Sequence, residues 1–264
     1  MPIGDFEREL LRLLATNRNP ESFVAGASVM LQLSDTPRES QDVDFFHDTT
    51  ESLEMSVVAD VAVLRNAGYE VEFHAGPPTF RRAIVKHAGG VSKIEWAFDS
   101  AFRFFPVEPD LDWGYRLNFW DVATNKVLAM AGRRAIRDYI DVIYLHERHL
   151  PLGALAWAAA GKDAGMTPEL VVELASRQAK YRDDDLADLR LRQPVDLREV
   201  KQTWLQAADE AEALFDRLPP AEMGCFYLDA SGKPVCPNPD APEFPKLVRH
   251  HGCVKGAWPR IAEQ

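Results

Sequence analysis

Apolar residues recur at helical spacing near the start of the chain and through most of its second half. Over 5–16, Leu10 and Leu14 lie four positions apart and would share one face of a helix. Over 51–67, a second helical pattern ends at Gly68, a residue type that commonly follows the last turn of a helix. The remaining predicted helices cover 121–131, 133–149, 152–163, 167–180 and 195–217.

Strand-like segments stand on both sides of the helix predicted over 51–67. Short apolar runs at 22–26 and 42–46 precede it, and a further strand is expected at 117–120. Three segments that directly follow this helix are separated by turns containing Gly or Pro, which is typical of hairpin-connected strands. They cover 69–74, 80–87 and 91–97. This order of helices and strands predicts a sheet domain with helices packed on it.

The changes of pattern divide the chain into three parts. We expect a sheet domain over 1–120 and a helical domain over 121–220. The last part, 221–264, is rich in proline, and its segment FYLDASGKPVCP predicts a β-hairpin that turns around Ser-Gly-Lys. The predicted fold class is therefore α+β, with a sheet domain followed by a helical C-terminal domain.

Composition limits the classes of protein to which the chain can belong. Hydrophobic residues make up 46% of its 264 residues, enough for a packed core. With 30 Lys and Arg against 41 Asp and Glu, the net charge is −11, so the chain as a whole lacks the basic field of a protein that coats nucleic acid. Three cysteines indicate a reducing compartment rather than a disulfide scaffold. We see no signal peptide and no apolar run near the ~18 residues of a membrane span, and expect a cytoplasmic protein with no membrane partner.

The most specific local signal is the pair Asp42 and Asp44. Because alternate side chains of a strand share a face, both carboxylates would point the same way. Two carboxylates converging from one strand can hold Mg²⁺, which prefers a few carboxylates together with substrate phosphates. An isolated pair of this kind is also compatible with two solvated acids on an exposed strand, so the neighbouring segments are needed to distinguish a metal site from a solvated surface.

Two neighbouring segments favour a catalytic interpretation. Gly26, Ala27 and Ser28 lie where an apolar strand turns into a helix, and such a turn lets backbone N–H groups approach a phosphate. Glu95 supplies a third acid on a later strand. A small-residue turn, a pair of aspartates and a third carboxylate are the layout of a two-metal nucleotidyl-transfer site.

These segments resemble the AbiEii/AbiGii toxin-type nucleotidyltransferases, a branch of the polymerase-β-like nucleotidyltransferase superfamily. The first similar stretch joins the turn at Gly26 to Arg38-Glu-Ser40-Gln-Asp42-Val-Asp44. The second is Asn125-Lys126 through Arg133, Arg137-Asp138 and Asp141, with the strand of Glu95 between the two. The family more often has Gly-Gly or Gly-Ser at the turn and Asp at the third acid. The resemblance spans about residues 20–145.

The resemblance implies a fold, an activity and a set of site residues. The fold would be a polymerase-β-like nucleotidyltransferase sheet domain followed by helices. The activity would be Mg²⁺-dependent transfer of NMP from an NTP to the hydroxyl of a tRNA 3′ end or of a protein, with one or two ions and a cognate antitoxin as partner. The implied metal ligands are Asp42, Asp44 and Glu95; the implied catalytic residues are these three with Lys126 and Asp138; the implied nucleotide-binding residues are Gly26, Ala27, Ser28, Ser40, Lys126 and Arg137.

Two other functions remain open at this point. An aspartate-nucleophile phosphatase also uses two aspartates after a strand, but it would favour a small or hydroxyl residue where Phe45 follows Asp44. A non-catalytic nucleotide-binding protein of the same fold is the other alternative. The presence of Asp42, Asp44, Glu95 and Lys126 together argues against it.

Overall fold

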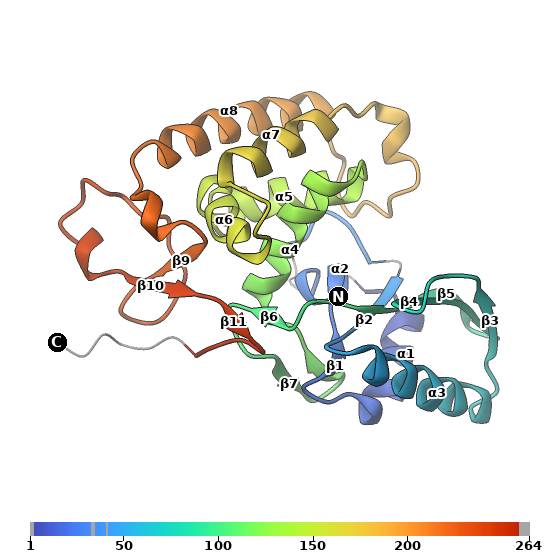
Figure 1. The fold of residues 1–264 in the computed structure, drawn as a ribbon. Coiled ribbons are helices and arrows are strands. Elements are labelled where there is room, and N and C mark those ends of the chain that lie inside the picture. The colour runs from blue at the N-terminus through green and yellow to red at the C-terminus, as the bar shows by residue number, and fades with distance from the viewer. Residues whose placement is uncertain (1–2, 33–34, 41, 259–264) are drawn as a thin grey trace. The chain divides into compact units, whose positions relative to one another are not determined.

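The computed structural model describes residues 3–32, 35–40 and 42–258, and Figure 1 shows the order of helices and strands. The chain divides into two compact units. The first consists of Met1–Ala101 and Pro106–Val122, and the second of Phe102–Phe105 and Ala123–Gln264. The division falls within helix α4 (Phe119–Gly132). Each unit has a core of its own.

A seven-stranded mixed sheet forms the first unit, in the order β3-β4-β5-β2-β1-β8-β7. Strand β2 pairs in parallel with β5, and β1 in parallel with β8, whereas the other neighbours are antiparallel. The strands are β1 (Ser22–Val24), β2 (Asp42–His47), β3 (Glu70–His74), β4 (Phe80–His87), β5 (Gly90–Phe98), β7 (Glu108–Asp110) and β8 (Gly114–Arg116).

Two helices cover one face of this sheet. Helices α1 (Asp5–Leu14) and α3 (Thr50–Asn66) both contact β2 and β5 (Figure 1). On the covered face, Val43, Phe45 and Trp96 are fully buried. The residues that alternate with them, among them Asp42 and Asp44, lie on the other face and are partly exposed. The sheet therefore has a covered apolar face and an open polar face.

The second unit is mainly helical. Helix α6 (Leu152–Ala159) contacts three other helices, and its own residues are all buried. These neighbours are α5 (Ile136–Arg148), α7 (Pro168–Gln178) and α8 (Leu197–Phe215). Two small antiparallel pairs complete the unit: β9 (Cys225–Leu228) with β10 (Val248–His251), and β6 (Phe102–Arg103) with β11 (Cys253–Val254).

The predicted helices and the strands over 42–46, 69–74, 80–87 and 91–97 are confirmed, with ends that differ by a few residues. The strand predicted at 117–120 is wrong, because α4 already begins at Phe119. The Asn118 side chain accepts a hydrogen bond from the Trp120 backbone N–H at 2.9 Å, as a helix-capping residue does. No helix in the described part of the chain combines the length and the apolar character needed to cross a bilayer.

The hairpin predicted in the last part of the chain is only partly right. Its turn forms, since the Asp229 N–H donates to the Lys233 carbonyl at 3.0 Å. Beyond the turn only an isolated bridge between Leu228 and Pro234 follows, because a proline has no N–H with which to continue a ladder. The main partner of β9 is β10, which is more distant in the sequence.

Candidate active site

The predicted acids Asp42, Asp44 and Glu95 lie on neighbouring strands and on the same open face of the sheet in the first unit. Strands β2 and β5 run in parallel with Asp44 directly opposite Glu95 and Asp42 opposite Lys93. Because the register sets residues of equal parity side by side, all four side chains project from the same face. The structure therefore brings the third predicted carboxylate to the aspartate pair.

Lys93 lies between two of these carboxylates. Its Nζ is 2.9 Å from Oδ2 of Asp42 and 2.9 Å from Oε1 of Glu95, so these two oxygens lie no more than twice that distance apart. Arg82 on β4 contacts the same Glu95 oxygen through Nη2 at 2.7 Å and Nε at 2.8 Å. Glu95 thus faces two cations, and Asp42 faces one of them.

These ion pairs keep Glu95 and Lys93 charged. Burial acts to raise the pKa of Glu95, but Lys93 and Arg82 outweigh it and hold that pKa below its ordinary value. Burial also acts to lower the pKa of Lys93, but hydrogen bonds and charge attraction from Asp42 and Glu95 raise it above the ordinary value. At neutral pH, Lys93 is therefore an ammonium ion and Glu95 a carboxylate.

Gly26 lies against the carboxylate of Asp44. Gly26 begins the short helix α2 (Gly26–Met30) with φ +66°, a conformation that glycine adopts without strain. A Cβ built at Gly26 would stand 2.1 Å from Oδ2 of Asp44, far inside van der Waals contact. Next to it, the Ala25 N–H donates to the Asp44 carbonyl at 2.9 Å. The position thus requires glycine for its backbone and for the space that Asp44 occupies.

The predicted nucleotide-binding serines Ser28 and Ser40 are buried behind the aspartate pair. Each hydroxyl oxygen lies 3.1 Å from the backbone carbonyl oxygen of Asp42, to which it can donate. These contacts fix the start of β2. Ala27, the other predicted residue of the turn, is also buried.

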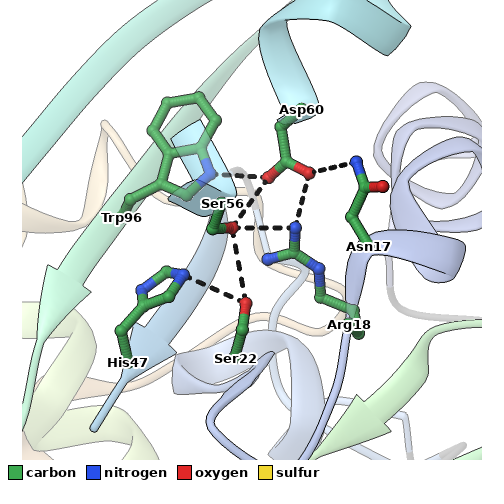
Figure 2. A network of polar contacts seen from close by, with 7 residues as sticks. All are labelled: Asn17, Arg18, Ser22, His47, Ser56, Asp60 and Trp96. Carbon is green, nitrogen blue, oxygen red and sulfur yellow. Dashed lines mark hydrogen bonds and ion pairs between the residues drawn. The ribbon is translucent and has the colours of Figure 1, made fainter. Parts of the chain in front are cut away.

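A buried polar network anchors β2 and β5 on the covered face (Figure 2). Asp60 of α3 accepts from Trp96 Nε1 at 2.7 Å and from Arg18 Nη2 at 2.5 Å, and both partners of the ion pair are fully buried. Arg18 also lies over the Phe45 ring, with 4.0 Å from Cζ to the ring centroid. Since Phe45 and Trp96 are paired across the two strands, this network holds the register that sets Asp44 opposite Glu95.

His47 extends the network from the end of β2. Its Nδ1 lies 3.3 Å from the Ala97 carbonyl, which can only accept, so Nδ1 carries the proton and Nε2 faces the Ser22 hydroxyl at 3.0 Å. Burial, and secondarily the charge of Arg18, lowers the pKa of His47 to about 4. His47 is therefore neutral and structural at physiological pH.

Lys126 and Asp138, two of the other predicted site residues, belong to a compact charged cluster in the second unit. Nζ of Lys126 on α4 lies 3.2 Å from Oδ1 of Asp138 and 2.8 Å from Oδ2 of Asp141, while Arg133 Nε contacts Oδ2 of Asp138 at 2.8 Å. Both aspartates are fully buried. Burial acts to raise the pKa of Asp138, but Lys126 and Arg133 prevail and lower it. Arg137, on the same helix as these aspartates, is partly exposed.

The residues of the open face fit a hard divalent cation by their chemistry. Asp42 and Asp44 offer only carboxylate oxygens, the ligands that Mg²⁺ prefers, and the missing side chain of Gly26 leaves room for one of them. Within the described residues, no three His, Cys, Asp or Glu side chains already converge as in a metal site. Lys93, a cation of the chain itself, lies between Asp42 and Glu95.

Comparison with known proteins identifies the family. A family model described as "Nucleotidyl transferase AbiEii toxin, Type IV TA system" matches residues 22–222, which is most of the chain. The chain belongs to this family. As a member of the AbiEii family, it is a nucleotidyltransferase of the toxin–antitoxin class. The match confirms the family and the enzyme class that the sequence predicted. No curated protein sequence is significantly similar to it.

Solved structures show that the fold of this AbiEii-family enzyme recurs at low sequence identity. JHP933 from Helicobacter pylori aligns with a TM-score of 0.51 and 16% identity, over 81% of this chain and 95% of that one. MenT4, a nucleotidyltransferase toxin from Mycobacterium tuberculosis H37Rv, aligns with a TM-score of 0.52 and 15% identity, over 82% of this chain and 83% of that one. The predicted α+β class with a helical C-terminal part is thereby confirmed.

Three polar residues of the first unit lie outside the site residues that the sequence predicted. Lys93 and Arg82 flank Glu95, and the Asp60 carboxylate accepts a hydrogen bond from Trp96 on the covered face of the sheet. A signal was present for Lys93, because Lys93 and Glu95 alternate on their strand as Asp42 and Asp44 do on theirs. Asp60 lies with Leu53, Val57 and Leu64 on the buried side of α3, and an acid at such a position indicates a buried partner.

Proposed function

We propose that this AbiEii-family enzyme transfers a nucleoside monophosphate from an NTP to an acceptor hydroxyl and releases pyrophosphate. In this reaction the hydroxyl oxygen forms a bond to the α-phosphorus, the bond to pyrophosphate breaks, and the hydroxyl proton passes to solvent or to a nearby carboxylate. The observation that carries the proposal is the placement of Asp42, Asp44 and Glu95 on one face of two adjacent strands, beside the tight approach of Gly26 to Asp44.

Each residue of the first unit has a distinct place in this proposal. Asp42 and Asp44 would hold Mg²⁺, with Glu95 completing the acidic set. When bound, the ion neutralises phosphate charge and favours the attacking oxygen. The backbone of Gly26 and Ala27 would approach the phosphates, where a side chain at Gly26 could not be accommodated. Ser28 and Ser40 would contribute by fixing β2 through the Asp42 carbonyl.

For the second unit we propose that Lys126 and Arg137 bind the nucleotide phosphates and that Asp138 orients Lys126. The contact of Lys126 with Asp138 and Asp141 supports an orienting role, because the carboxylates restrict a flexible side chain. Arg137 directly precedes Asp138 in the sequence and is partly exposed, which supports its proposed role in ligand binding. A compact ammonium and a planar guanidinium are both common partners of phosphate.

The partners are inferred from the family and from its chemistry. We propose RNA, and first a tRNA 3′ end, as the acceptor, with a protein hydroxyl as the alternative. The family description as a toxin of a type IV toxin–antitoxin system supports a cognate antitoxin as a further partner. We also propose that the chain acts in the cytoplasm, where NTPs and tRNA are present.

The test is incorporation of label from four α-³²P-labelled NTPs, supplied one at a time with Mg²⁺ and total RNA. Wild type should incorporate label from at least one NTP, and Asp44→Asn should lose at least about 100-fold, because it removes a charged ligand of the ion. Folding of the variant is checked by circular dichroism. Incorporation that is equal in the two proteins would refute the assigned site. Release of inorganic phosphate from simple phosphoesters without incorporation would instead indicate a phosphatase, and NTP binding without either reaction a binding protein.

A further inference from the structure

We infer that Lys93 is a built-in second cation of this site, so that the enzyme binds one divalent ion at Asp42 and Asp44 while the ammonium of Lys93 occupies the place between Asp42 and Glu95. This inference rests on the proposed function. It narrows the expected number of ions from one or two to one and gives Lys93 a positioning role.

The contacts of Lys93 carry the inference. Nζ lies 2.9 Å from an oxygen of Asp42 and 2.9 Å from an oxygen of Glu95, so one ammonium bridges carboxylates from two different strands. In a two-metal site, a second metal ion would likewise supply positive charge among such carboxylates. The ammonium and a divalent ion would compete for the same oxygens.

The surroundings of Lys93 restrict its movement. The side chains of Lys93, Asp42 and Glu95 are about three-quarters or more buried, at 24%, 24% and 17% exposed. Arg82 binds the same oxygen of Glu95 and keeps that carboxylate turned toward β4 and Lys93. The carboxylate of Asp44 faces Gly26, where a Cβ would collide with it. Lys93 thus holds Asp42 and Glu95, whereas Asp44 adjoins the turn at Gly26.

A charge argument gives the expected effect of removing Lys93. A unit positive charge within about 5 Å of a divalent ion in water weakens its binding by more than tenfold. Lys93→Met should therefore tighten Mn²⁺ binding at the acidic set by about tenfold or add one ion per chain. Lys93→Arg retains the charge and should bind Mn²⁺ as wild type does.

The measurement is a titration of the full chain with Mn²⁺, with free ion followed by electron paramagnetic resonance. Lys86→Met is the matched control, because Lys86 is also a salt-bridged lysine of the same sheet, paired with Glu72 outside the site. We expect one bound ion in wild type, tighter or additional binding in Lys93→Met, and no change in Lys86→Met. Two ions in wild type, or the same binding in wild type and Lys93→Met, would overturn the inference.

Nucleotide incorporation measured on the same samples separates the two claims. Incorporation by wild type together with unchanged Mn²⁺ binding in Lys93→Met overturns the role of Lys93 and leaves the proposed function in place. Tighter Mn²⁺ binding in Lys93→Met, with no incorporation by wild type from any NTP, supports the cation role and overturns the proposed function.

Discussion

The close approach of Gly26 to Asp44 makes Gly26→Ala a sharp test of the site. A methyl group at this position would lie 2.1 Å from Oδ2 of Asp44, so the carboxylate or the turn must move. The backbone at Gly26 has φ +66°, where an alanine costs about 1–2 kcal/mol relative to glycine. We therefore expect the free energy of unfolding to fall by about 1–2 kcal/mol, with more if Asp44 cannot turn aside.

The effect on activity should be larger than the effect on stability. Displacing a ligand of the reacting group by about 1 Å costs on the order of 100-fold in rate. The free energy of unfolding is measured by urea titration, and NMP transfer is measured under conditions where circular dichroism shows a folded protein. Gly89→Ala is the matched control in the same unit, because a Cβ there meets Phe6 at an ordinary 3.8 Å. Wild-type transfer by Gly26→Ala would refute the proposed geometry of Asp44 and the turn.

Two further predictions concern buried charges. Burial is the main cause that lowers the pKa of His47 from 6.5 to about 4, so the folded state favours the neutral imidazole. The protein therefore has its full stability from this group above pH 6.5, and its free energy of unfolding falls by about 3 kcal/mol as the pH drops to 4. His47→Gln should lose less stability than wild type between pH 7 and pH 4 in urea titrations, and equal losses would contradict the assignment. Lys126→Met leaves Asp138 and Asp141 buried without their ammonium and should lower the free energy of unfolding by about 3–5 kcal/mol. Lys126→Met with Asp141→Asn should recover part of that loss, whereas a fully stable Lys126→Met would show that the cluster does not depend on the ion pair.

The sequence was sufficient for the aspartate pair, because the strand period alone sets Asp42 and Asp44 on one face. It could not supply the position of Glu95 in space, which depends on parallel pairing of β2 with β5 in one particular register. A shift of one residue in that register would have turned Glu95 to the covered face. The family resemblance implied that Glu95 lies beside the aspartates. The parallel pairing of β2 with β5, two strands far apart in the sequence, is the physical reason for that position.

Local signals also explain the remaining errors. Asn118 is a helix-capping residue, and the aromatic residues after it read equally well as a strand, so the start of α4 was misassigned. The ion pair of Arg18 with Asp60 joins a loop to a helix, and no pattern in either segment identifies the partner of the other. Such long-range polar pairing is set by packing and is visible only in the folded structure.

The central claim is that Asp42 and Asp44 hold the ion that receives the NTP phosphates. It is tested most directly by a crystal of the wild-type enzyme grown with Mn²⁺ and a non-hydrolysable NTP analogue, with anomalous diffraction recorded at the manganese edge. The account predicts an anomalous peak coordinated by both aspartates and by the analogue's phosphates beside Gly26. A peak bound elsewhere, with the analogue away from this face of the sheet, would contradict it.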